Sequence, residues 1–121
     1  MYSMKIESIQ NDEIKFDNGS RLVFEHYQDC CEKVYADCKN IQSLSSENFR
    51  YNKVEFDEPP QFAMAEGVGV ELIARTGMRY LISCYNIQNG YYSSNLSMTF
   101  IDANGNRTEL VDDVEKKDNV Y

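Results

Sequence analysis

The sequence lacks the features that mark several classes of protein. No hydrophobic run approaches the roughly 18 residues that a membrane-spanning helix needs. The start, residues 1–7, has neither the basic region nor the apolar stretch of a secretory signal. Repeats, low-complexity segments and Gly/Ser linkers do not occur either. We therefore expect a cytoplasmic protein, in which cysteines stay reduced and disulfides are disfavoured.

Basic residues are also few. The chain has 12 Lys and Arg against 20 Asp and Glu, which gives a net charge of −8. A chain of this charge is repelled by phosphate backbones and anionic lipid, so direct binding to nucleic acid or membranes is not expected. The acidic surface suits a basic partner protein, including one whose basic groove normally holds nucleic acid. Alternatively, the charge only keeps a small protein soluble.

Sequence motifs of common enzyme classes are missing as well. There is no Gly-rich phosphate loop or catalytic triad motif, and Gly67-Val68-Gly69 lacks the rest of a nucleotide fingerprint. A nucleophilic pair of Cys30 and His26 would also need an orienting group and an oxyanion hole. We therefore do not expect an enzyme. A small hydrolase with a catalytic metal or thiol is the third hypothesis, after the two binding functions given below.

The length and composition fit one globular domain. The chain has 121 residues, of which 42% are hydrophobic and 26% charged. The pattern of apolar residues and the hairpin signals Asn18-Gly19 and Asn89-Gly90 predict a sheet in each half of the chain. The predicted strands cover residues 4–10, 13–16, 21–27, 68–75, 80–87, 91–101 and 107–111.

The segment between the two halves is ambiguous. Val34, Cys38 and Ile41 recur at helical spacing, which predicts a short helix within residues 29–45. We therefore predict an α+β fold, mostly antiparallel β-sheet with one or two short helices and stabilised by zinc. It forms a single domain over residues 1–111, and the charged C-terminal tail over residues 112–121 is expected to fray.

Potential metal ligands are concentrated in one part of the chain. Three of the four cysteines and the only histidine lie within residues 26–38. Zinc prefers thiolate and imidazole ligands, binds four of them tetrahedrally and needs them deprotonated. The chain therefore predicts one structural zinc, and its candidate ligands are His26, Cys30, Cys31, Cys38 and Cys84.

Spacing leaves open which four of these residues bind. Neighbours on a strand point to opposite sides, so Cys30 and Cys31 would not easily share one ion. Cys31 and Cys38 would lie ~10 Å apart on an unbroken helix. Cys84 shares a strand face with Ile82 and is expected to point toward the core. The chain has no Cys-x-x-Cys pair, and the alternative is that the cysteines are small buried hydrophobic residues.

Tyrosines supply a second pattern. Tyr85, Tyr91 and Tyr92 bracket the Asn89-Gly90 turn. Tyrosine and asparagine on loops are common in protein-binding surfaces. Aromatic packing across a hairpin explains the same residues equally well.

Two motifs carry a resemblance to known proteins. The run Phe24-x-His26-x-Gln28-Asp29-Cys30-Cys31-Glu32-x-Val34-Tyr35 and the later Asn89-Gly90-Tyr91-Tyr92-Ser93 resemble hallmarks of a family of short phage and prophage proteins. The resemblance covers roughly residues 15–101. The chain is also similar in size, acidity and cysteine content to zinc-containing anti-CRISPR proteins of streptococcal prophages, which inhibit the RNA-guided DNA nuclease of type II systems.

This resemblance implies a function and a set of ligands. It implies a phage-encoded inhibitor that binds a type II CRISPR nuclease without catalysis. The acidic charge adds the expectation that the protein docks on or beside the positively charged channel of the nuclease and hinders the loading of target DNA. The resemblance also places His26, Cys30 and Cys31 in the metal site, whereas Cys38 lies outside the motif. The alternative is a zinc-stabilised protein-binding adaptor with another phage or host partner.

Overall fold

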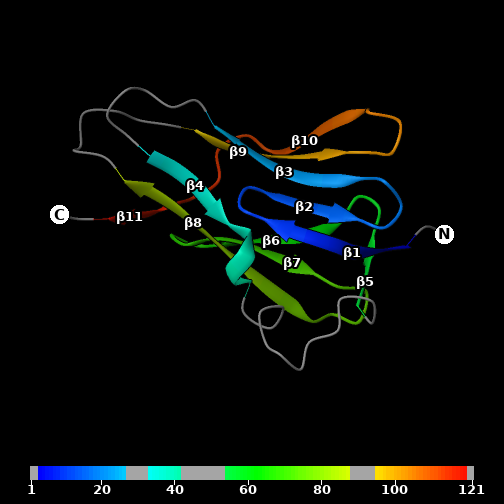
Figure 1. Ribbon diagram of the computed structural model, residues 1–121. Coiled ribbons are helices and arrows are strands. Elements are labelled where there is room, and N and C mark those ends of the chain that lie inside the picture. The colour runs from blue at the N-terminus through cyan, green and yellow to red at the C-terminus, as the bar shows by residue number, and fades with distance from the viewer. Residues whose placement is uncertain (1–2, 27–32, 42–53, 88–94, 120–121) are drawn as a thin grey trace.

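The computed structural model describes residues 3–26, 33–41, 54–87 and 95–119, which form two β-sheets (Figure 1). In chain order the strands are β1 (Ser3–Gln10), β2 (Glu13–Phe16), β3 (Arg21–His26), β4 (Lys33–Asp37), β5 (Glu55–Asp57), β6 (Gln61–Ala65), β7 (Gly69–Ile73), β8 (Arg79–Ile87), β9 (Leu96–Ile101), β10 (Arg107–Val111) and β11 (Lys117–Asn119). The first sheet has the order β10-β9-β3-β2-β1-β5. The second has the order β11-β8-β7-β6, and β4 also pairs with β8.

The predicted α+β class is wrong, because the regular structure of the described segments is almost entirely β-strand. Their helical content is one 3-10 turn, η1 (Cys38–Asn40). The expected short helix is β4, in which the buried Val34 and Ala36 alternate with more exposed neighbours. Cys38 and Ile41, in and after η1, are also fully buried. Three buried residues therefore fall at a helix-like spacing because a strand is followed by a tight turn.

Alternating side chains position the six-stranded sheet on the core. Ile14 and Phe16 of β2 and Leu22 and Phe24 of β3 are all at most 3% exposed, and polar residues separate most of them. β3 pairs with β9 along its whole length, from Arg21 opposite Ile101 to His26 opposite Leu96. His26 is thus the last paired residue of a central strand.

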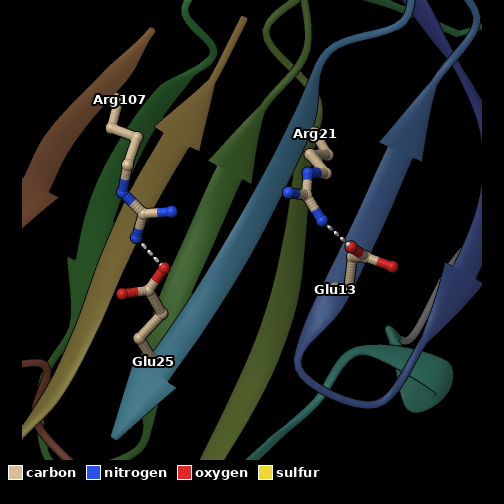
Figure 2. A network of polar contacts seen from close by, with 4 residues as sticks. All are labelled: Glu13, Arg21, Glu25 and Arg107. Atoms are coloured by element: carbon tan, nitrogen blue, oxygen red, sulfur yellow. Dashed lines mark hydrogen bonds and ion pairs between the residues drawn. The ribbon is translucent and has the colours of Figure 1, made fainter. Parts of the chain in front are cut away.

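The outer face of this sheet is covered by its own charged side chains. Arg21 pairs with Glu13 at 3.0 Å, and Arg107 pairs with Glu25 (Figure 2). Both pairs are largely exposed, so the charge interactions contribute little to stability. Three residues of β3 and β9 that face away from the core are nevertheless less than 9% exposed. These residues are Val23, Thr99 and Ile101.

The long strand β8 organises the second sheet. Ser83 pairs with both Gly69 of β7 and Asp37 of β4. Residues 85–87 of β8 pair with both β4 and β11. β4 therefore lies on one side of β8, and β7 and then β11 lie along its other side. Residues 112–121, expected as a charged tail, include the fully buried Val114 and the parallel strand β11.

The two sheets share one core and are joined along their edges. The core contains buried side chains from strands of both sheets, including Phe16, Met98, Leu72 and Ile82. Backbone hydrogen bonds link the sheets, for example from the N–H of Asp12, between β1 and β2, to the Ala36 carbonyl of β4 at 3.1 Å. No helix in the described residues is long and apolar enough to span a membrane.

Candidate functional site

Asp12, in the turn between β1 and β2, connects three parts of the fold. It is the one non-glycine residue with a positive φ, 65°, in the described part of the chain. Its N–H donates to the Ala36 carbonyl at 3.1 Å, and its Oδ1 accepts from the Ala36 N–H at 2.7 Å. Its own carbonyl accepts from the N–H of Phe24 at 2.8 Å. Aspartate tolerates this left-handed conformation better than most residues, which favours it at this position.

His26 lies beside this aspartate at the end of β3. Its Nε2 is 3.6 Å from Asp12 Oδ2, and its side chain is 15% exposed. The other ring nitrogen, Nδ1, is buried and has no hydrogen-bond partner among the described residues. A buried polar nitrogen without a partner costs about 1–3 kcal/mol. Within the described residues, His26 therefore has one ring nitrogen near a carboxylate and one without a partner.

The thiols of Cys38 and Cys84 lie in the core near the same aspartate. Burial, and then the negative charges of Cys84 and Asp12, raise the pKa of Cys38 well above its ordinary value, although a backbone hydrogen bond from Asp12 opposes this. Burial raises the pKa of Cys84 to about 12, against a smaller lowering by Lys116. Both residues are fully buried free cysteines. Without a metal, both are therefore protonated thiols and poor nucleophiles.

The inner face of β8 carries one further buried polar group. Asn86 lies two positions from Cys84 on the same face and is 8% exposed. No partner for its Oδ1 is found in the residues that the structure describes. Lys116, whose side chain is 10% exposed, donates to the Val114 carbonyl at 3.0 Å. His26 and Asn86, near the ends of β3 and β8, thus each carry one buried polar atom without a partner among the described residues.

The structure places three of the five predicted metal ligands. The predicted orientation of Cys84 is confirmed, since Cys84 and Ile82 are both fully buried on one face of β8. Asp12 lies near His26, Cys38 and Cys84, although the described residues contain no group of three or more His, Cys, Asp or Glu arranged to hold a metal. Cys30 and Cys31 lie outside the described residues, so the full ligand set stays a prediction.

Sequence reasoning missed Asp12. Its role depends on contact with β4, which is more than 20 residues away in the sequence. The signal that points to it is local: an Asn11-Asp12 pair between two predicted strands is typical of a tight turn. That signal predicts a turn and gives no information about what the turn contacts.

A second feature is an acidic hollow on the surface of the six-stranded sheet. The hollow has a volume of about 360 Å³ and is lined by Glu25, His26, Asn95, Ser97 and Asp112. A hydrogen bond and the negative charge of Asp112, with a smaller effect of Glu25, raise the pKa of Glu109 above its ordinary value. Like charges are therefore crowded here, and Arg107 neutralises one of them by pairing with Glu25 (Figure 2).

A third feature is an aromatic pair on the second sheet. Tyr35 of β4 and Tyr85 of β8 are directly opposite each other, and their rings stack with centroids 5.0 Å apart. Tyr85 thus packs on an aromatic residue of β4, a partner that the sequence did not indicate. Tyr91, Tyr92 and the Asn89-Gly90 turn lie outside the described residues.

Comparison with known proteins identifies a family. A family model described as a domain of unknown function, DUF7448, matches residues 2–98, and the chain belongs to this family. The match includes all five predicted metal ligands, whereas Glu109 and Asp112 lie beyond it. No curated protein and no solved structure matches the chain significantly.

Proposed function

We propose that this chain is a phage-encoded inhibitor that binds a type II CRISPR nuclease in the host cytoplasm and hinders its loading of target DNA. The observation that carries the proposal is the acidic hollow lined by Glu25 and Asp112, with Glu109 hydrogen-bonded to Asp112, in a chain of net charge −8. The resemblance of the segment from Phe24 to Tyr35 to phage and prophage proteins suggests which basic partner this surface meets.

The crowding of carboxylates gives the surface a reason to bind a cation. The raised pKa of Glu109 reflects the hydrogen bond and the repulsion from Asp112 in the free protein. A lysine or arginine of a partner placed near both groups would remove that repulsion. RNA-guided nucleases hold their heteroduplex in a positively charged channel, which supplies such side chains. An acidic protein docked at the channel would block entry of target DNA without any chemical step.

The test combines a cleavage assay with charge variants. Purified protein in excess is expected to reduce cleavage of a linear target by the guide-loaded nuclease and to reduce target binding in a gel-shift. The double variant Glu109→Gln/Asp112→Asn is expected to associate more slowly, because rim charges mainly affect the association rate. The control Glu7→Gln/Glu66→Gln makes the same change in net charge at two other exposed positions and is expected to inhibit normally.

The possible outcomes separate the hypotheses. Full cleavage in the presence of a large excess of protein, with nucleases from several hosts, would reject the inhibitor and favour the adaptor hypothesis. Reduced cleavage with normal target binding would keep the inhibitor and reject occlusion of DNA loading. An equal loss of inhibition in both double variants would show that binding depends on the net charge of the protein and not on the acidic hollow.

We also propose that one zinc ion stabilises the fold, held by His26 together with thiolates. The buried, unpartnered Nδ1 of His26 supports this, because imidazole nitrogen is a preferred zinc ligand. The resemblance adds Cys30 and Cys31 to the set of ligands. Cys38 and Cys84 are further candidates, because both thiols lie near Asp12, which lies beside His26. Bound zinc would contribute its binding free energy to folding.

Metal analysis tests the zinc proposal directly. Protein purified without added metal is expected to contain about one zinc per chain, and His26→Ala is expected to lose it. A strong chelator should lower the melting temperature of the original protein and leave that of His26→Ala unchanged. A zinc content near zero, with chelator having no effect on melting, would contradict the proposal.

A further inference from the structure

The strand β6 forms an edge of the second sheet. It pairs with β7, from Gln61 opposite Ile73 to Ala65 opposite Gly69, and no other described strand lies beside it (Figure 1). Among the described residues, the backbone N–H and carbonyl groups on its outer side are therefore not paired with a strand, and another strand can pair with them.

The side chains of β6 do not protect this edge. Charged residues on edge strands discourage pairing with other chains. β5 carries Glu55 and Asp57, and β10 carries Arg107 and Glu109. β6 has the sequence Gln-Phe-Ala-Met-Ala and contains no ionisable residue. It is therefore the edge at which strand addition meets the least electrostatic opposition.

One face of β6 extends the hydrophobic core to the edge. Phe62 pairs with Leu72 and Met64 pairs with Val70, and both partners on β7 are fully buried. Phe62 packs against the core, whereas Met64 is 41% exposed, although it points to the same side. The hydrophobic core thus ends at the β6 edge in a partly exposed apolar surface formed by Phe62 and Met64, which we call the ledge.

We propose that β6 pairs antiparallel with β6 of a second copy of this chain, about a two-fold axis at Ala63. In this register Phe62 lies opposite Met64 of the second copy, and Met64 lies opposite its Phe62. Aromatic rings and methionine sulfur make favourable contacts, so the two ledges are complementary. The same register sets Gln61 opposite Ala65 and Glu66 opposite Pro60, and no two carboxylates face each other.

Charge restricts where two copies can meet. Two chains of net charge −8 repel each other over most of their surfaces. The uncharged β6 edge allows them to meet with little local repulsion. The remaining long-range repulsion is screened by salt, so the dimer should become stronger as salt is added. Binding of a basic partner at the acidic hollow has the opposite salt dependence, which separates the two interactions.

Sedimentation equilibrium of purified protein at low and high salt tests the proposal. We expect a monomer–dimer equilibrium that shifts toward dimer with salt. Met64→Glu places a carboxylate opposite an apolar side chain and is expected to weaken the dimer about tenfold or more. Met78→Glu is the matched control, because Met78 is 54% exposed and lies between β7 and β8, away from the β6 edge. It is expected to dimerise normally.

A cross-linking pair tests the register itself. Directly opposed residues in an antiparallel pair have Cα atoms about 4.5–5.5 Å apart, within the range of a disulfide. Ala63→Cys is therefore expected to form a disulfide-linked dimer with a mild oxidant, identified by mass spectrometry of the linked peptide. Ala65→Cys is not, because the two copies of that position would lie ~13 Å apart along the strands.

Three outcomes would overturn the proposal. A protein that stays monomeric at all concentrations and salt conditions has no such dimer. Equal weakening by Met64→Glu and Met78→Glu would place the contact elsewhere, and linked dimers of Ala65→Cys in preference to Ala63→Cys would exclude this register. None of these measurements involves a nuclease, so the dimer and the proposed inhibitor function succeed or fail separately.

Discussion

Replacing Asp12 by alanine tests directly how much the Asp12 carboxylate stabilises the fold. The carboxylate accepts the N–H of Ala36, a residue that is fully buried, at 2.7 Å. Alanine leaves this N–H without its acceptor at a partly buried position. Alanine also adopts the observed φ of 65° less readily than aspartate does.

The expected loss follows from these two effects. A buried donor left without a partner costs about 1–3 kcal/mol. The left-handed backbone adds a further ~1 kcal/mol for alanine. We expect Asp12→Ala to lower the free energy of unfolding by about 2–4 kcal/mol, and the melting temperature by roughly 6–20 °C for a chain of this length. Asp12→Asn keeps an acceptor oxygen and tolerates the same φ, so it should lose less than half as much.

Urea unfolding followed by circular dichroism measures these differences. The matched control is Asp17→Ala, because Asp17 also accepts a backbone N–H, that of Lys5 at 3.0 Å, but at an exposed position. Water replaces that acceptor, so the loss should stay below about 1 kcal/mol. If Asp12→Ala and Asp17→Ala cost the same, Asp12 does not have the central role that its contacts indicate.

Three further predictions concern other parts of the chain. Gly69→Ala should destabilise the protein by at least about 3 kcal/mol in urea unfolding, because the new Cβ would lie 2.1 Å from a backbone carbonyl oxygen, whereas Gly77→Ala, with open space around it, should cost roughly 1–2 kcal/mol. Burial raises the pKa of Cys84 from an ordinary 9.0 to about 12, so the folded protein keeps a proton that the unfolded chain loses. The free energy of unfolding of the metal-free protein should therefore decrease as the pH rises between these values, and by less in Cys84→Ala. Asp112→Asn should return the pKa of Glu109 toward its ordinary value in an NMR titration, and an unchanged pKa would contradict the hydrogen bond between them.

The hairpins were predictable because their signals are local. The strands over residues 13–16 and 107–111 have the predicted bounds, since alternating side chains and the turn Asn18-Gly19 or Asn104-Gly105 define them. β5 and β6 were not predicted, because both are short and lie on either side of Pro59-Pro60. β11 was missed because its residues are polar and its only partner, β8, lies far away in the sequence.

For the candidate site too, local sequence signals predicted some features, and others depend on contacts between distant segments. The orientation of Cys84 follows from strand alternation alone, and the structure confirms it. Glu109 and Asp112 have no common motif in the sequence, and they come together because the chain bends after β10. The contact between Asp12 and β4 depends on the packing of two sheets. Local patterns therefore predicted directions of side chains, and tertiary contacts decided which of them meet.

The three partners of β8 have a consequence for how fast the protein folds. They come from residues 33–37, 69–73 and 117–119, so the strand unites early, middle and late parts of the chain. Proteins dominated by contacts between distant segments fold in milliseconds to seconds, much more slowly than helical bundles of similar size. Until β11 arrives, part of β8 has an open side that other chains can reach. Refolding yield should therefore fall as protein concentration rises. Slower pairing of β11, which begins at Lys117, with β8 should lower the yield further.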